Sequence, residues 1–371
     1  MGKRRRSAAF RVARRTSLAL AVLALVALAA EPALADIPET PLAGTWGTNG
    51  TVYAITGAGD VAYLGGSFSA VIGPNGGSLP RANVAAIDLS TGEPTSWAPR
   101  VSGAVHALAT DGKTVFVGGT FTKVDNQPRA RFAAIGLGGN LRSLRADATS
   151  SVYALAVHGS TVFMGGDFWQ VNGQSRGRLA AVTTAGELLG WHPSANGRVR
   201  SLAVDRKSVL VAGDFTSVNG DWSRRHVARL DVETGELRGF SEPPGYPAYD
   251  VTVVDRIVYA AIAGPGGRVM SWDIHGDTRW TTYTDGDAQA IGFADGEVIA
   301  GGHWDYISKT LVPKLAALDP TTGVLNKAWV PRPNGGGIWA IRAYADQLLV
   351  GGNDFSYVGG VWASRFARFA L

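Results

Sequence analysis

The sequence predicts an all-β fold, a seven-bladed β-propeller with four-stranded blades, and three observations carry this prediction. Gly makes up 49 of the 371 residues, and Gly-Gly pairs recur at a regular spacing along the chain. Short runs of β-branched and aromatic residues are separated by Asn, Asp and Gly, which are signals for strands and hairpins. No window has a sustained 3.6-residue periodicity, so helices are not expected. Four strands in each of seven repeats are typical of propeller blades.

Residues 1–35 have the order of a secretory signal peptide. The basic segment Met1–Arg15 leads into the apolar run Leu18–Ala30, and Ala33-Leu34-Ala35 offers the small residues of a cleavage site. We expect cleavage after Ala35 and a secreted protein, with residues 36–371 as its single domain. The apolar run is too short for a stable transmembrane helix, and no later segment is long enough. The sequence leaves open whether export follows the Sec or the twin-arginine route.

The net charge of +5 belongs to this leader. Residues 1–35 hold seven basic residues and one acidic residue, so 28 basic and 29 acidic residues remain in the domain. A nearly neutral domain argues against a nucleic acid as partner. The absence of Cys excludes disulfides, thiolate metal sites and thiol nucleophiles. We expect a monomer whose partner is an extracellular ligand or protein.

Each repeat contains the same elements in the same order. A strand such as Val105–Ala109 comes first, followed by a polar turn and a strand that ends in Gly-Gly, such as Val115–Gly119. A loop then leads to a third strand with the pattern Ala-Ala-Ile-Asp, and a Thr-Gly hairpin leads to a fourth strand with a large apolar residue. The pairs and their equivalents are Gly65-Gly66, Gly118-Gly119, Gly165-Gly166, Ala212-Gly213, Gly301-Gly302 and Gly351-Gly352.

The last repeat lacks its fourth strand, because the copy that starts at Ile338 ends at Leu371. Near the N-terminus, Gly44–Gly47 looks like the fourth-strand segment Thr95–Ala98. We therefore expect the N-terminal strand around Trp46 to be the outer strand of the last blade, which removes an exposed strand edge. The outer-strand apolar residues would then number seven: Trp46, Trp97, Leu144, Trp191, Phe240, Trp280 and Trp329.

Two resemblances follow from these repeats. The segment Gly165–Gly173, followed by Arg178–Ala181, resembles the delta-60-type repeat of secreted bacterial propellers, a resemblance that implies a fold more than an activity. The segment Ala86–Trp97 is similar to the tryptophan-docking motif of quinoprotein propellers, and Ala317–Trp329 is a looser match. The second resemblance implies that a quinone cofactor with a calcium-type ion is an alternative, although no carboxylate-rich metal cluster stands out.

A variable position in the first strands marks the candidate site. In a propeller the first strands border the central channel, so side chains at this position would converge near the channel mouth, where a ligand can bind. The position is ambiguous in the fifth blade, where either Tyr249 or Asp250 occupies it. The alternative, that these side chains only plug the channel, stays open. The candidate ligand-binding residues are Tyr53, His106, Tyr153, Arg200, Tyr249, Asp250, Gln289 and Trp339.

Basic loops between the second and third strands form a secondary candidate, represented by Arg131, Arg178 and Arg225. Such side chains attract carboxylates, phosphates or acidic glycans. The same repetition is typical of a structural arginine that bonds loop carbonyls, and both interpretations stay open. The segment His303–Tyr306, which breaks the pattern of the sixth blade, is either a sugar-stacking patch or a packed blade edge.

The sequence favours a binding or interaction module over an enzyme. The six His residues have no metal-ligand spacing, and no Gly-x-Ser-x-Gly motif occurs. Catalytic residues therefore stay unassigned, and neither a metal nor a cofactor is expected. A glycan or another extracellular ligand at the channel mouth is the primary hypothesis. The alternative is an enzyme that works at the same face: a quinone-dependent sugar dehydrogenase, a lyase or a glycosidase.

Overall fold

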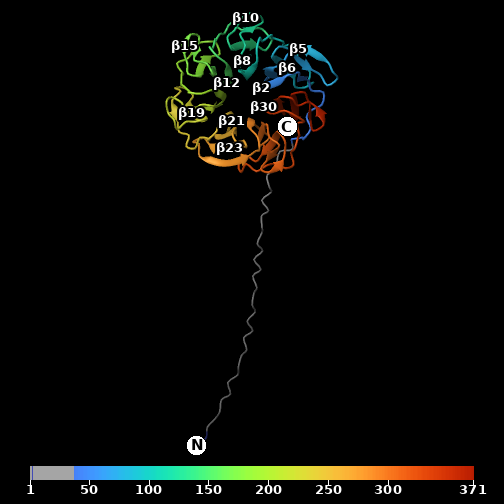
Figure 1. Ribbon diagram of the computed structural model, residues 1–371, viewed down its shortest axis with the longest axis vertical. Coiled ribbons are helices and arrows are strands. Elements are labelled where there is room, and N and C mark those ends of the chain that lie inside the picture. The colour runs from blue at the N-terminus through green and yellow to red at the C-terminus, as the bar shows by residue number, and fades with distance from the viewer. Residues whose placement is uncertain (1, 3–36) are drawn as a thin grey trace. The chain divides into compact units, whose positions relative to one another are not determined.

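The computed structural model describes Gly2 and residues 37–371, and within residues 37–371 every regular element is a β-strand. The predicted signal peptide, Gly2 apart, lies outside the described residues. No helix that could cross a membrane occurs in the described part of the chain. Seven larger sheets and five smaller ones make up the structure. The larger sheets follow one another in chain order around a common centre (Figure 1).

Each larger sheet pairs a first, a second and a third strand in antiparallel fashion. The first strands are β2 (Thr51–Ala58), β7 (Val105–Thr110), β12 (Val152–His158), β17 (Val199–Asp205), β21 (Ala248–Val254), β25 (Ala288–Ala294) and β30 (Ile338–Tyr344). The second strands are β3 (Val61–Ser67), β8 (Thr114–Gly119), β13 (Thr161–Gly166), β18 (Ser208–Gly213), β22 (Ile257–Ile262), β26 (Glu297–Gly302) and β31 (Gln347–Gly352). The third strands are β6 (Val84–Asp88), β11 (Phe132–Gly136), β16 (Leu179–Thr183), β19 (Val227–Asp231), β23 (Arg268–Asp273), β29 (Leu315–Leu318) and β34 (Phe366–Ala370).

The smaller sheets lie in the loops between second and third strands. One of them also includes β1, near the N-terminal end of the described chain. Their strands are β1 (Gly47–Thr48) with β4 (Ala70–Ile72) and β5 (Ser78–Pro80), β9 (Lys123–Val124) with β10 (Gln127–Pro128), β14 (Gln170–Val171) with β15 (Gln174–Ser175), β27 (Tyr306–Ile307) with β28 (Thr310–Leu311), and β32 (Tyr357–Val358) with β33 (Val361–Trp362).

The fourth strand is shorter than the sequence predicts. Among the described residues it forms a strand in two sheets, as β20 (Leu237–Arg238) and β24 (Thr278–Tyr283). In four other sheets it is reduced to one bridge: Ile87–Pro94, Ile135–Leu141, Val182–Leu188 and Leu318–Leu325. In three of these four, an arginine side chain rather than a longer ladder satisfies the carbonyls of the segment. These bonds run from Arg81 to Thr95, from Arg129 to Arg142 and from Arg176 to Leu189, with N···O distances of 2.8–2.9 Å.

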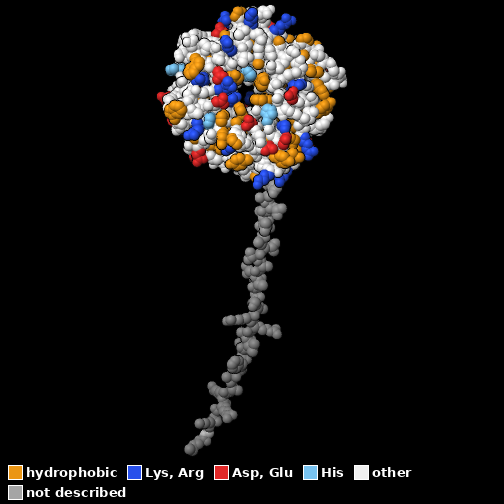
Figure 2. All heavy atoms as spheres, in the orientation of Figure 1, with side chains coloured by type: hydrophobic (Ala, Val, Ile, Leu, Met, Phe, Trp, Pro, Cys, Tyr) orange, Lys and Arg blue, Asp and Glu red, His pale blue; other side chains and the backbone are white. Residues whose placement is uncertain are grey.

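Consecutive sheets pack face to face through buried clusters of hydrophobic side chains. Seven such clusters occur within residues 37–371, and each joins two neighbouring sheets. One of them places Val52 and Leu64 of the first sheet against Leu349 and Phe366 of the last. Strand β2 likewise contacts β30. The space-filling view shows a hollow at the centre of the face that the sheets surround (Figure 2).

The first Gly of each Gly-Gly pair has a packing role that the sequence pattern alone does not show. A Cβ at Gly118 would lie 2.7 Å from a methyl of Val152, which begins the first strand of the next sheet. Gly165 meets Val199 in the same way, at 2.4 Å. Where Ala212 replaces Gly, the residue that begins the next first strand is Ala248 rather than Val. Glycine is therefore needed where its neighbour is β-branched, because interiors are close-packed.

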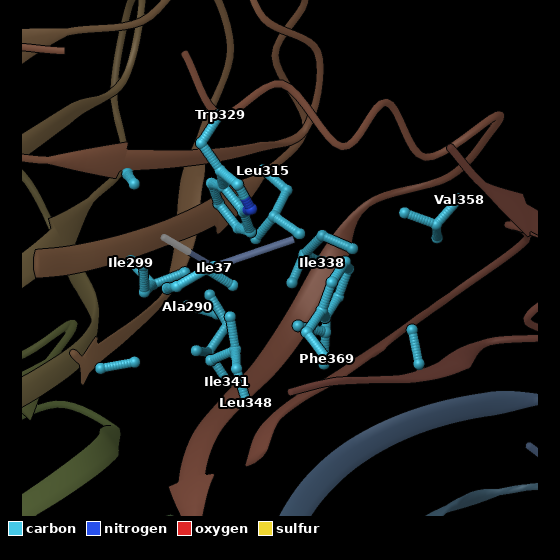
Figure 3. Packing of buried hydrophobic residues seen from close by; sticks show 14 of the residues in the cluster. Ile37, Ala290, Ile299, Leu315, Trp329, Ile338, Ile341, Leu348, Val358 and Phe369 are labelled. Atoms are coloured by element: carbon cyan, nitrogen blue, oxygen red, sulfur yellow. The ribbon is translucent and has the colours of Figure 1, made fainter. Parts of the chain in front are cut away.

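The N-terminal segment lies between the last sheet and the first. The amide of Leu42 donates to the carbonyl of Arg368 in β34, while β1 pairs with β4. Ile37 packs in a buried cluster with side chains of the sixth and seventh sheets (Figure 3). The indole of Trp329 donates to the carbonyl of Pro38 at 3.1 Å. The backbone bond to β34 itself is thus made at Leu42, four residues before the predicted centre of this strand. Thr48 donates its amide to Ser364, just before β34, and Trp46 is only half-buried.

Candidate functional site

A β-bulge in every first strand places the candidate residues. The register of the pairing between the first and second strands shifts near the start of the first strand. In β2, for example, Val52 and Ala54 have partners in β3, and the residue between them is left without a partner. The same shift recurs in the other six first strands. Bulges re-aim a side chain without disturbing the rest of the strand. The left-over residues are those of the variable position: Tyr53, His106, Tyr153, Arg200, Tyr249, Gln289 and Trp339.

All seven of these residues line one central cavity of about 530 Å³. We call them the channel ring. The register also resolves the ambiguity in the fifth sheet, because Tyr249 is the bulged residue there and Asp250 pairs with Ala261. Asp250 takes the next position, where the other first strands carry Ala or Ser, and it lines the same cavity. The structure thus brings together all eight residues that the sequence singled out.

One side of the channel ring is aromatic. The ring centroids of Tyr53 and His106 are 5.0 Å apart, and those of His106 and Tyr153 are 4.9 Å apart. Trp339 meets Tyr53 edge-on at 5.9 Å and meets His303 edge-on at 5.6 Å. We call these five residues the aromatic arc. Tilted and edge-to-face contacts of this kind hold the rings in place.

The other side of the mouth carries two ion pairs. Arg200 binds both carboxylate oxygens of Asp214, at 2.6 and 2.9 Å, and its guanidinium lies 4.6 Å from the ring centroid of Tyr249. Arg198 pairs with Asp167 at 2.8 Å and lies 4.6 Å from the ring centroid of Tyr153. These pairs are partly exposed and add little stability. Their effect is to hold both guanidinium groups over the faces of tyrosine rings.

Asp250 bridges three sheets within the channel wall. One carboxylate oxygen accepts from the hydroxyl of Ser201 at 2.6 Å and from its neighbour's amide, Val251, at 2.9 Å. The other accepts from the amide of Ile291 at 3.0 Å. Shielding from water raises the pKa of Asp250 to about 6, although these hydrogen bonds and the charge of Arg342 favour the ionised form.

His106 is held neutral by its surroundings. Shielding from water and the charge of Arg198 lower the pKa of His106 to about 4. Shielding, with Lys314 as a further cause, also lowers the pKa of His303. Near neutral pH both histidines of the aromatic arc are therefore uncharged, which suits contact with an uncharged ring face.

The basic loops do not join this site. None of Arg131, Arg178 and Arg225 lines the central cavity. Arg131 and Arg178 have φ values of 65° and 66°, and each donates its backbone amide to a loop carbonyl. The equivalent residue in the fourth sheet is His226, with φ 62°, so Arg225 falls one residue early and is exposed. Of these three side chains, only that of Arg178 bonds a loop carbonyl, donating to Ala195 at 2.8 Å, so the structural interpretation is supported for Arg178.

The segment His303–Tyr306 divides between two roles. Trp304 is buried, and its indole donates to the carbonyl of Val312 at 2.9 Å, as expected of a packed edge. His303 instead belongs to the aromatic arc, and Tyr306 is exposed. The sequence analysis did not predict that His303, Arg198 and Asp214 contact residues of the channel ring. The signal was available, since His303 and Asp214 directly follow the Gly-Gly position of their repeats.

The donor set does not fit the quinone-and-calcium alternative. No group of three or more His, Asp or Glu residues that could hold a metal occurs within residues 37–371. Calcium takes six to eight oxygen ligands, and the cavity wall offers the single carboxylate of Asp250. Glycoside hydrolysis generally uses two carboxylates, which the cavity wall also lacks. The arrangement is better suited to binding than to either reaction.

Comparisons with known proteins bear on the fold alone. No family model matches this chain, and no curated protein matches it. The computationally designed Ika8 protein is similar in structure, with a TM-score of 0.56, 14% identity, and coverage of 90% of this chain and 100% of that one. The WD40 β-propeller domain of Doa1 has a TM-score of 0.59 and 13% identity, covering 91% and 97% of the two chains. This chain therefore has an all-β fold like that of a β-propeller.

Proposed function

We propose that this chain is a secreted, monomeric binding module, a closed seven-bladed β-propeller that captures an extracellular ligand at its channel mouth. A glycan is the first candidate ligand. The observation that carries the proposal is the set of seven bulges, which aim seven side chains of five types into one cavity. A scaffold that repeats its core and varies its cavity is expected to use the cavity for recognition.

Closure of the ring is supported by contacts between its two ends. Gly351 of the last sheet faces Val52 of the first, in the same way as Gly118 faces Val152. The buried cluster between these sheets and the bond from Leu42 to Arg368 support the N-terminal segment as the outer element of the seventh blade. A closed ring has no long unpaired strand edge, which favours a monomer.

The aromatic arc supports a glycan as the ligand. Tyr53, Tyr153 and Trp339 are only half-buried, although each contacts a ring neighbour or a guanidinium. Trp339 and Asn353 also bond to one another, with the indole nitrogen 3.1 Å from the amide oxygen. Partly exposed aromatic rings suit the apolar faces of sugars, and Gln289, whose amide oxygen has no hydrogen-bond partner among the described residues, adds a polar group to the cavity wall.

The test replaces Tyr53, Tyr153 and Trp339 by Ala together. We expect the variant to lose capture on a panel of immobilised glycans and to keep its melting temperature nearly unchanged, because the three side chains lie outside the seven core clusters. The measurements are binding to the panel and thermal unfolding.

The matched control replaces three exposed aromatic residues that do not line the cavity, Trp222, Tyr306 and Tyr357. This control variant should retain binding. A large loss of stability in the first variant would instead show that the ring is a structural plug. Capture of no glycan by the unmodified protein would remove glycans as the ligand class.

A further inference from the structure

Arg342 is an unusual residue in the channel wall. It stands two positions after Ala340, at a register position where every other first strand has a small side chain. The six counterparts are Thr56, Ala109, Ala156, Ala203, Thr252 and Gly292. One long, positively charged side chain thus lines the cavity below the channel ring. The repeated architecture does not require it, because the other six repeats have a small residue at this position.

The guanidinium of Arg342 is free to bind a ligand. Its side chain is exposed and lines the cavity, and within residues 37–371 it makes no hydrogen bond or ion pair with the protein. Arg200, by contrast, is occupied by Asp214. Shielding within the cavity lowers the pKa of Arg342 and the negative charge of Asp250 opposes that shift, but the carboxylate of Asp250 already accepts three hydrogen bonds. Five N–H donors without a partner in a cavity favour an oxyanion.

The size and the other lining residues of the cavity indicate which kind of oxyanion it can hold. The volume of about 530 Å³ suits a molecule of one or two sugar rings. The aromatic arc at the mouth offers ring faces, and Phe293 and Val254 make the deeper wall apolar. The negative charge of Asp250 in the same cavity disfavours a dianion such as a phosphate monoester and is better tolerated by a single carboxylate.

We propose that Arg342 binds the carboxylate of an acidic sugar, a uronic acid unit, whose ring lies against the aromatic arc. This inference rests on the proposed function and names the ligand class of the same cavity. A bidentate contact of the guanidinium with the carboxylate would orient the sugar, and the open mouth would let the rest of a chain extend outward.

The test compares four probes, D-glucuronate, D-galacturonate, D-glucose and D-glucose 6-phosphate, by isothermal titration calorimetry on residues 36–371. At least one uronate should bind at least about tenfold more tightly than glucose, the size expected of charged hydrogen bonds. Arg342→Gln should remove this preference, and Arg342→Lys should keep part of it. Lys113→Gln, which removes an exposed charge in the β7–β8 turn, should have no effect.

The outcomes separate this inference from the proposed function. Equal binding of uronates and glucose, or an unchanged preference in both Arg342 variants, would overturn the uronate assignment while leaving the channel mouth as a binding site. A preference for glucose 6-phosphate would also overturn it, in favour of phosphate. Failure of all four probes to bind contradicts the inference. Loss of uronate binding in the triple aromatic variant, with Arg342 intact, would support the two proposals together.

Discussion

At the scale of single residues, packing in the channel ring shields His106 from water and makes stability depend on pH. His106 lies between Tyr53 and Tyr153 and is shielded from water, which lowers its pKa to about 4 from an ordinary value of 6.5. Between these two pH values the unfolded chain binds a proton that the folded chain does not. Stability therefore falls as the pH drops from about 6.5 towards 4.

His106→Gln should remove this part of the acid sensitivity. We expect the loss of unfolding free energy between pH 7 and pH 4.5 to be smaller in the variant than in the unmodified protein, by at most about 3 kcal/mol. Urea denaturation at both pH values gives the four free energies that are needed. Equal losses in the two proteins would show that His106 titrates normally in the folded state.

At the scale of elements, neighbouring sheets are matched in the size of their facing side chains. Gly118 accepts Val152, and Gly165 accepts Val199, at distances that leave no room for a Cβ. The spacing of Gly along the chain thus encodes contacts between sheets as well as turns within them. This reciprocity makes one packing contact testable by a double-mutant cycle.

Gly118→Ala should cost about 1–3 kcal/mol because it overpacks the contact with Val152. Adding Val152→Ala should recover part of that loss, so the double variant should be more stable than the sum of the single effects predicts. The control Gly190→Ala, where no atom lies within 4 Å of a new Cβ, should change stability by less than about 0.5 kcal/mol. Chemical denaturation of the four variants gives their unfolding free energies. Strict additivity of the effects of Gly118→Ala and Val152→Ala would contradict the packing argument.

At the scale of the whole molecule, Arg368 ties the two ends of the chain together. Its buried guanidinium donates to Thr45 in the N-terminal segment, to the carbonyl of Leu89 in the turn after β6 of the first sheet, and to Gln347 in the last sheet. Shielding from water lowers the pKa of Arg368, so the three acceptors are what make its burial tolerable.

Arg368→Met should lower the unfolding free energy by about 2–4 kcal/mol, because it removes charged hydrogen bonds and leaves buried acceptors without a partner. The amide of Leu42, which donates to the carbonyl of residue 368, should lose protection from hydrogen exchange. In the control Arg238→Met, which breaks a partly exposed pair with Asp231, the protection of Leu42 should stay as it is. Unchanged protection in Arg368→Met would separate this side chain from closure of the ring.

Much of the candidate site was predictable because it repeats. A variable residue at one position of each first strand, such as Tyr53 or Trp339, can be aligned without a structure, and the structure places all of them on one cavity. Arg342 could have been found by aligning one more position of the same strands. Arg198 could not be placed in this way, because its contact with the ring of Tyr153 depends on how neighbouring sheets pack.

The sequence by itself determined the all-β class, the repeat and the position of the variable side chains, because strand signals and turn residues act over short stretches of chain. Only the tertiary structure decided that Tyr249 rather than Asp250 is the bulged residue, since that choice depends on the pairing of β21 with β22. It also decided that Arg200 is paired and Arg342 is free. Those outcomes depend on contacts between residues far apart in the chain, which the spacing of residues along a strand does not contain.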